Sequence, residues 1–186
     1  MENYLVKDLM VPISEYATVS VGTTLIDAVR VLEKAQEAYT VSKYQHRAIL
    51  VLDDTGDVVG KIGQLRALKA IDRQFDFADE IEEVKKFQFS DGYVAALRDR
   101  YRTKGDVLNT KALRQAANKK VEEFMQKPTP GEYVAEDSTL DAAIHRLVAG
   151  THLSLLVTRG KKIVGILRIA DVFAAIFHEM ESIERE

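Results

Sequence analysis

Two stretches of this chain are versions of the same segment, and that duplication limits the folds available to it. At a constant spacing of 115 residues, Val6 matches Val121, and the same spacing relates Met10 to Met125, Val19 to Val134, Thr24-Leu25 to Thr139-Leu140, Ala28 to Ala143 and Leu32 to Leu147. After nine extra residues in the first copy, the match resumes with His46 and His152, Leu50-Val51 and Leu156-Val157, and Val59-Gly60 and Val164-Gly165. Two copies of one unit commonly pack face to face with pseudo-two-fold symmetry, and the seam between them is a natural ligand cleft.

Each copy has short apolar runs, helical periodicity and turn residues in an order that predicts strand, helix, strand, strand, helix. In the first copy Thr23 or Thr24 can cap the first helix, and the elements are expected at 17–20, from 25, at 48–52, at 58–62 and from 65. In the second copy they are expected at 133–135, from 140, at 153–158, at 162–167 and at 169–180, with a frayed tail at 181–186. The predicted fold class is α+β, with one repeat in residues 1–72 and the other in residues 121–186.

Residues 73–120 match neither copy and form an insert whose charge is divided. From Asp76 to Asp91 there are six acidic residues and two lysines, whereas from Arg98 to Lys120 there are eight basic residues and two aspartates. Apolar residues recur through the insert at helical spacing, the last of them being Leu113, Ala117, Val121 and Phe124. We therefore expect two or three amphipathic helices here, which could also dock a protein partner.

The composition argues against several classes of function. A net charge of −3 and a pI near 5.9 give no general attraction to nucleic acid or to an anionic membrane. Nucleic-acid binding by the basic part of the insert is disfavoured, because the acidic part can neutralise it. The chain has no cysteine, residues 1–4 do not begin a signal peptide, and no apolar run approaches the ~20 residues that span a bilayer. We expect a cytoplasmic protein with no membrane segment.

Patterns typical of enzymes and metal sites are missing from the sequence. It contains no Gly-x-x-x-x-Gly-Lys-Ser/Thr phosphate loop, no serine or cysteine nucleophile elbow, and no His, Asp and Glu cluster at metal-ligand spacing. The four histidines are scattered, and His145 and His178 fall on predicted helices. We predict no enzyme activity, no catalytic residues and no metal site.

The order and duplication of these motifs resemble the CBS domain family, whose small modules occur in tandem pairs. In the first copy the resemblance is carried by residues 6–10, 24–28, 46–53 and 58–62. In the second copy it is carried by residues 121–125, 138–143 and 163–172. The resemblance covers about two thirds of the chain, and the insert lies outside it.

This resemblance implies a non-catalytic regulatory module that binds an adenine-containing ligand, such as AMP, ADP, ATP or S-adenosylmethionine, in the cleft between the repeats. No cofactor is required, and the nucleotide acts as a regulatory ligand. In that family the aspartate of a Gly-x-x-Ser/Thr-x-x-Asp stretch holds the ribose hydroxyls, and the opposite repeat supplies the adenine pocket. Such pairs commonly form flat homodimers through helical faces, and residues 172–180 of the last helix are a candidate face.

Asp171 stands at the family's ribose position in the second repeat. Its carboxylate oxygens can accept hydrogen bonds from both hydroxyls of a cis-diol. The alternative is that Asp171 only favours the N-terminus of the final helix, by about 0.3–1 kcal/mol. Arg168 stands where the family usually has Ser or Thr near the phosphate, with Ile169 beside it. Its guanidinium could clamp a phosphate, fill the cleft or pair with a surface acid.

By pseudo-symmetry, Asp171 should face a part of the first repeat that contains Tyr16, Ala17, His46, Arg47 and Ala48. Ala17 and Ala48 are small enough to let a flat base approach the backbone. His46 and Arg47 are candidates for phosphate contact, or are simply solvated side chains.

The second cleft would need a carboxylate where the first repeat has Arg66, which cannot accept a hydrogen bond from a diol. We predict that this cleft, opposite Tyr133, Val134 and Ser154, is empty or binds differently. One nucleotide site per chain is therefore expected. Two functions stay open: a ligand-sensing module, and a protein-interaction scaffold on a degenerate pair with no small-molecule ligand.

Overall fold

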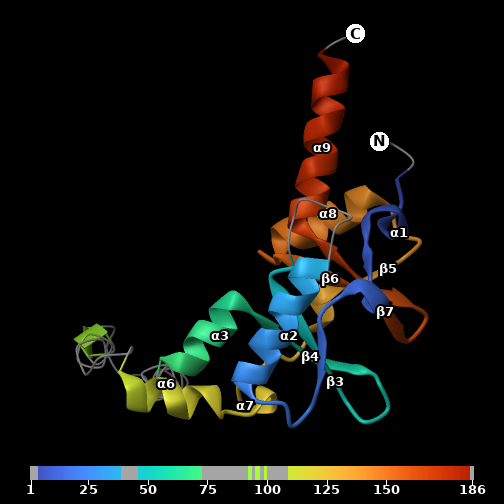
Figure 1. Cartoon of the computed structure of the whole chain (residues 1–186). Coiled ribbons are helices and arrows are strands. Elements are labelled where there is room, and N and C mark those ends of the chain that lie inside the picture. Colours follow the sequence, from blue (N-terminus) through green and yellow to red (C-terminus); the bar gives the residue numbers. More distant parts are fainter. Residues whose placement is uncertain are drawn as a thin grey trace.

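The structure is a computed structural model that describes residues 4–38, 46–72 and 109–184, with five isolated positions between 92 and 99. The fold is mixed α+β. One sheet has the strand order β2-β3-β4 and the other the order β1-β7-β6-β5, with helices around both (Figure 1).

The two repeats present their elements in the same order. The first contains α1 (Val6–Leu9), β1 (Val11–Pro12), η1 (Ile13–Glu15), β2 (Thr18–Ser20), α2 (Leu25–Ala38), β3 (Ala48–Leu52), β4 (Val58–Gly63) and α3 (Gln64–Ile71). After α6 (Thr110–Ala117), the second contains α7 (Val121–Phe124), η3 (Pro130–Glu132), β5 (Tyr133–Ala135), α8 (Leu140–Ala149), β6 (Ser154–Arg159), β7 (Lys162–Arg168) and α9 (Ile169–Ile183).

Cap and turn residues start and separate these elements, and of the two threonines predicted to cap the first helix it is Thr24 that does so. The Thr24 hydroxyl accepts the Asp27 N–H at 3.3 Å and caps α2, and Thr139 does the same for α8. Between β3 and β4, Asp53 accepts two N–H groups of the turn at 2.9 Å each. Gly56 in that turn has φ of 82°, a conformation that favours glycine.

The entrance segment of each repeat packs into the core of the other repeat. We use this name for residues 4–12 and for residues 119–126. Val6 lies in the core of the second repeat, among the buried side chains of Val134, Leu140, Ala143, Leu147, Leu155, Val157, Leu167 and Val172. Val121 lies in the core of the first repeat, among Ala17, Val19, Ala28, Ile49, Val51 and Ile62. The repeats are therefore interlocked.

Backbone hydrogen bonds hold the two entrance segments in equivalent ways. The Val6 N–H donates to the Ser138 carbonyl at 2.9 Å, and the Val121 N–H donates to the Thr23 carbonyl at 2.9 Å. β1 then pairs antiparallel with β7, and Gln126 makes an antiparallel bridge to β4. The pseudo-two-fold symmetry is thus visible in the backbone bonds themselves.

A third apolar cluster joins the two sheets. It brings Val11, Tyr16 and Leu50 of the first repeat against Leu156 and Ile166 of the second, all of them buried. This cluster therefore holds the two repeats together through apolar contacts.

Two sequence predictions about helices are wrong. The last helix, α9, continues to Ile183 instead of fraying after Met180. In α6, which contacts α2 and α3, the buried side chains are Ala112 and Ala116, and Ala116 packs with Leu25 and Ala70. Leu113 is 38% exposed. The apolar face is therefore rotated by one residue from the prediction. Apart from the isolated positions, the rest of the predicted insert lies outside the described residues.

Two glycines let the entrance segments approach the sheets closely. A Cβ on Gly165 in β7 would lie 2.7 Å from the Val11 carbonyl oxygen and 2.9 Å from Sδ of Met10. A Cβ on Gly60, its counterpart in β4, would collide with Met125. The glycine of the Val-Gly pair that both copies share therefore leaves room for the entrance segment against the sheet.

The substitution Gly165→Ala should destabilise the protein by about 1–3 kcal/mol, because a backbone carbonyl cannot move aside as a flexible side chain can. Urea unfolding followed by circular dichroism measures the loss. Gly131→Ala is the matched control, since a Cβ there would have its nearest contact, Nε2 of His152, at an ordinary 3.5 Å. If Gly165→Ala were as stable as the control, the close approach would be wrong.

Candidate functional site

The junction of β7 and α9 places Arg168 and Asp171 within reach of each other. Nε and Nη2 of Arg168 donate to the two carboxylate oxygens of Asp171 at 2.5 and 2.7 Å. Only 7% of the Arg168 side chain and 13% of the Asp171 side chain are exposed. This two-point contact is the strong, charge-assisted kind that guanidinium and carboxylate groups form.

The first repeat contributes His46 and Tyr16 to the same place. Nη1 of Arg168 lies 3.5 Å from Nδ1 of His46, and the rings of His46 and Tyr16 meet edge to face with centroids 4.5 Å apart. His46 is fully buried, and its carbonyl accepts a 2.6 Å hydrogen bond from Nε2 of Gln36. We call Tyr16, His46, Arg168 and Asp171 the Arg168 seam.

The surroundings of His46 favour its neutral form. Burial lowers the pKa of His46, and the positive charge of Arg168 lowers it further. A hydrogen bond to the backbone of Glu15 and the charge of Asp171 oppose this shift without cancelling it. At neutral pH the ring therefore adds no positive charge beside the guanidinium.

The other four predicted residues have different surroundings. Ala17 is buried in the core of the first repeat, and Ala48 packs at the cluster that joins the sheets. Arg47 is exposed. Ile169 is 41% exposed, and its N–H donates to the Leu153 carbonyl at 3.0 Å. Half of the predicted residues thus meet in the Arg168 seam, and the ligand-binding role of all eight stays a prediction.

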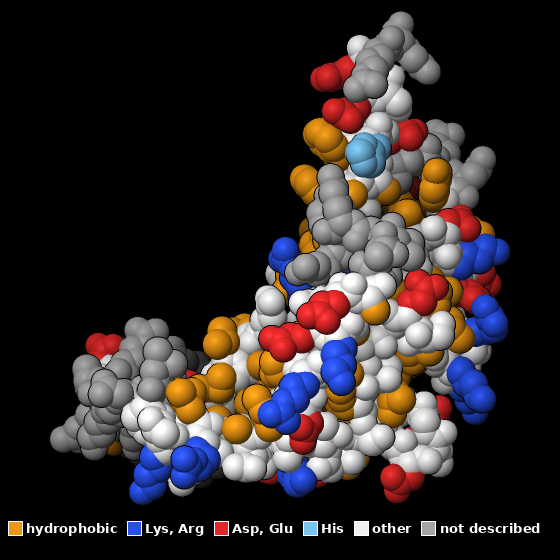
Figure 2. Space-filling view, in the orientation of Figure 1, with side chains coloured by type: hydrophobic (Ala, Val, Ile, Leu, Met, Phe, Trp, Pro, Cys, Tyr) orange, Lys and Arg blue, Asp and Glu red, His pale blue; other side chains and the backbone are white. Residues whose placement is uncertain are grey.

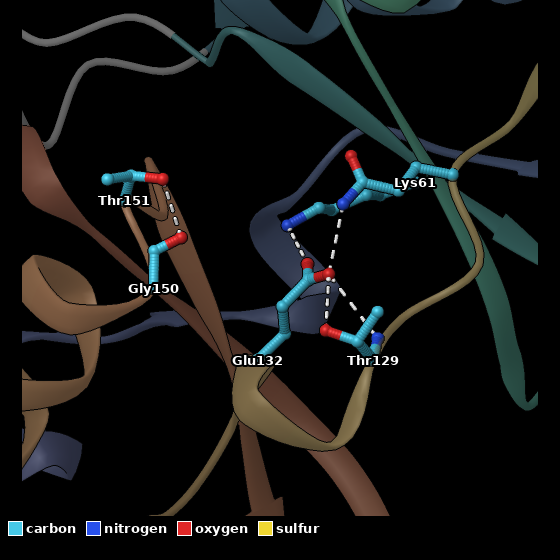
Figure 3. A network of polar contacts seen from close by, with 6 residues as sticks. Lys61, Thr129, Glu132, Gly150 and Thr151 are labelled. Carbon is cyan, nitrogen blue, oxygen red and sulfur yellow. Dashed lines mark hydrogen bonds and ion pairs between the residues drawn. The ribbon is translucent and has the colours of Figure 1, made fainter. Parts of the chain in front are cut away.

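A second buried ion pair joins the repeats elsewhere. Nζ of Lys61 in β4 pairs with Oε2 of Glu132 in η3, whose side chain is fully buried (Figure 3). Oε1 of Glu132 accepts hydrogen bonds from Nε2 of Gln126 at 2.9 Å and from the Thr129 hydroxyl at 3.2 Å. We call these four residues the Glu132 seam.

The sequence reasoning missed this group, although the duplication holds a signal for it. At the spacing of 115 residues, Glu132 falls opposite Ala17, and both immediately precede the first strand of their β-α-β-β-α unit. Strand register pairs Lys61 with Leu50 and, in the other repeat, Ile166 with Leu156. The ion pair of Lys61 and Glu132 therefore stands where the other side of the repeat pair has the apolar residues Ile166 and Ala17.

Two of the three residues predicted to lie across from Arg66 pack in apolar clusters. Val134 is in the core of the second repeat, and Tyr133 packs at the cluster that joins the sheets. Arg66 itself is half-buried. That this side of the pair binds no nucleotide stays a prediction.

Glu132 is held in its charged form by its partners. Burial by itself raises the pKa of Glu132, but the hydrogen bond and charge of Lys61, together with the donors of Thr129, outweigh burial and hold the pKa below its ordinary value. The ion pair is therefore present at neutral pH, with its carboxylate removed from water.

A surface hollow lies on α6 and α7. Lys111, Arg114 and Lys119 line it together with Glu123. Three of these four side chains belong to the basic part of the insert, for which nucleic-acid binding is disfavoured by the sequence. None of the residues of this hollow belongs to the Arg168 seam or the Glu132 seam.

Two absences hold for the described part of the chain. Within those ranges, no three His, Asp or Glu side chains gather as metal-ion ligands. None of the helices described there is both long and apolar enough to cross a membrane.

Comparison with known proteins identifies the family. The model of the CBS domain family matches residues 6–73 and 121–178, which are the two repeats. The chain belongs to the CBS domain family, and it is a tandem CBS pair, which is a regulatory module. A search of curated proteins finds no match.

Solved structures with the same fold include other CBS proteins. A CBS domain-containing protein of unknown function from Bacillus anthracis is 19% identical, with a TM-score of 0.61 and 95% of each chain covered. CBSX2 in complex with AMP is 20% identical, with a TM-score of 0.58 and 95% of this chain and 98% of that chain covered. The cytosolic domain of the Mg2+ channel MgtE in complex with ATP is 18% identical, with a TM-score of 0.51 and 90% and 46% covered.

The substitution Glu132→Gln should destabilise the protein by about 3–5 kcal/mol, because it leaves the buried ammonium of Lys61 without its counter-charge. The double variant Lys61→Met, Glu132→Leu should recover part of that loss, since it removes the ammonium together with its counter-charge while Gln126 and Thr129 lose their acceptor. Urea unfolding of Lys61→Met alone, of Glu132→Leu alone and of the double variant gives the coupling energy. Strictly additive effects would mean that the two side chains do not form a buried pair.

Proposed function

We propose that this tandem pair is a non-catalytic sensor that binds an adenine nucleotide of the AMP, ADP or ATP class at the Arg168 seam. The observation that supports it most directly is the meeting of Asp171 and Arg168 with His46 and Tyr16 of the opposite repeat. This group combines a carboxylate for ribose hydroxyls, a cation for phosphate and an aromatic ring, which together suit a nucleotide.

A ligand bound there would contact both repeats. It would therefore stabilise one arrangement of the repeats over others, and that difference in affinity is what couples binding to a change seen by a partner. CBSX2 with AMP and the MgtE cytosolic domain with ATP support this choice of ligand, since both share the fold.

Thermal melts with AMP, ADP, ATP and S-adenosylmethionine test the proposal. One nucleotide should raise the melting temperature, because a ligand at 100 times its Kd stabilises the folded state by about 2.7 kcal/mol. Asp171→Asn should abolish that shift. Asp141→Asn should keep it, and it is the matched control because Asp141 also lies in the first turn of its helix, α8, but is exposed.

A shift that survives Asp171→Asn would refute the assignment of the site. If none of the four ligands moves the melt, the scaffold function takes its place. The Arg168–Asp171 pair favours that second candidate, since it already engages both oxygens of the carboxylate.

The surface of α9 supports a homodimer as the form in which the pair works. This helix projects from the body of the molecule (Figure 1), and hydrophobic side chains are visible along it (Figure 2). The exposed large apolar residues of α9 are Ile169, Phe173, Phe177, Met180 and Ile183. We therefore propose that α9 pairs with a second copy, where this apolar area would leave water.

The double variant Phe173→Glu, Phe177→Glu should be monomeric at concentrations where the natural chain is a dimer, because it places charges in the apolar contact. Sedimentation equilibrium measures the masses. Val148→Glu is the control, since Val148, at 71%, is at least as exposed as Phe173 and Phe177 but lies on α8. A monomeric natural chain, or a dimer that persists in the double variant, would contradict the pairing.

A further inference from the structure

The hollow on α6 and α7 is formed by the outward face of a helix whose other side is packed. Ala112 and Ala116 of α6 are buried, and the Asn109 side chain accepts the Ala112 N–H at 2.8 Å at the start of the helix. The exposed side chains that line the hollow at the spacing of one helical face are Lys111, Arg114, Gln115 and Asn118. We call this hollow the α6 hollow. Its basic side chains are therefore presented from a fixed backbone.

The charge of the α6 hollow is mainly positive. Among the described residues that line it, Lys111, Arg114 and Lys119 are basic and Glu123 is acidic. Oε1 of Glu123 accepts the Lys120 N–H at 2.8 Å, so this carboxylate already caps α7. Within the described ranges of the chain, no ion pair joins Lys111 or Arg114 to a carboxylate. Both cations are exposed and available to an anion from outside.

The start of α6 adds to the positive potential of the hollow. Lys111 lies in the first turn of α6, which contains no acidic residue. The N-terminal end of a helix dipole is positive, so a cation there is unfavourable and an anion is favourable. A negative side chain in the hollow would therefore relieve this repulsion as well as pair with the cations. Figure 2 shows Lys and Arg side chains over α6.

We propose that the α6 hollow is the docking site for a partner protein, which inserts a short segment rich in Asp and Glu. The carboxylates of such a segment pair with Lys111 and Arg114. The Gln115 amide and the Thr110 hydroxyl, which also line the hollow, can bond the backbone of the segment. This inference does not depend on the proposed nucleotide site, because it holds for a sensor and for a scaffold alike.

The size and lining of the hollow favour an acidic peptide segment over nucleic acid. From Lys111 to Asn118 the helical face spans about 10 Å, which about three residues of extended chain cover. No aromatic side chain lines the hollow within the described residues, whereas single-stranded nucleic acid is commonly held by stacking on aromatic rings along a basic groove.

The α6 hollow adjoins the contacts that interlock the repeats. The carbonyl of Lys119, which lines the hollow, accepts the Leu25 N–H at the start of α2 at 2.9 Å. Val121, two residues further on, lies in the core of the first repeat. A partner in the hollow would therefore contact the entrance segment itself, and a change in how the repeats pack would reach the partner directly.

Fluorescence anisotropy of the full chain with a fluorescein-labelled oligoglutamate of about six residues tests the docking site. The natural protein should bind this probe, and the affinity should fall as salt is raised to about 0.15 M, because exposed charges are screened. The double variant Lys111→Glu, Arg114→Glu should bind it about tenfold more weakly or worse, since two attractive contacts become repulsive.

The double variant Lys161→Glu, Lys162→Glu is the matched control. It changes the net charge by the same amount, and both lysines are exposed, but they lie at the hairpin between β6 and β7 of the second repeat. Its affinity for oligoglutamate should equal that of the natural chain. Should Lys111→Glu, Arg114→Glu not fold by circular dichroism, Lys111→Gln, Arg114→Gln takes its place and should bind the probe about threefold more weakly.

Several outcomes would overturn the docking site. One is a natural chain that does not bind oligoglutamate, and another is an equal loss of affinity in the control. Tighter binding of a labelled oligothymidylate of the same length, lost in Lys111→Glu, Arg114→Glu, would assign the hollow to nucleic acid instead. Binding of oligoglutamate only after the acidic residues from Asp76 to Asp91 are changed to Asn and Gln would make this chain's own acidic segment the occupant.

Discussion

The exchange of entrance segments is the constraint on which the other features depend. Val6 completes the core of the second repeat, and Val121 completes the core of the first. A unit of this size buries only a modest core, so removing one central side chain leaves each repeat incomplete. The interlocking therefore makes the pair one folding unit, and it places the polar residues at the ends of β4 and β7 against the opposite repeat.

The duplication places the Arg168 seam and the Glu132 seam on equivalent backbone elements, but the side chains of the two seams differ. In the Glu132 seam, a buried carboxylate and Lys61 pair directly across the repeats. In the Arg168 seam the ion pair lies within one repeat, and only the His46 and Tyr16 rings come from the other. The first arrangement links the two repeats through charge, whereas in the second the charged contact stays within the second repeat.

Much of the fold could be predicted from the sequence, because two matching stretches of the chain indicate each element. The two hairpins, the caps at Thr24 and Thr139, and the pairing of the repeats all follow from matched residues. The exchange of entrance segments could not be predicted, because the sequence is equally consistent with Val6 and Val121 each packing in the core of its own repeat. The rotated face of α6 had a similar cause: its small alanines are buried because α2 and α3 lie close, which periodicity does not reveal.

The candidate site was predictable in its residue types but not in its internal bonding. Asp171, Arg168, His46 and Tyr16 follow from the repeat and from the family pattern, whereas the bidentate pair between Arg168 and Asp171 needs the geometry of the strand end and helix start.

Methyl NMR of Val6→Ala tests the exchange of entrance segments most directly. The largest shift changes should fall on Val134, Leu155 and Leu167 of the second repeat. Changes concentrated on Val19, Ile49 and Val51 of the first repeat would contradict it.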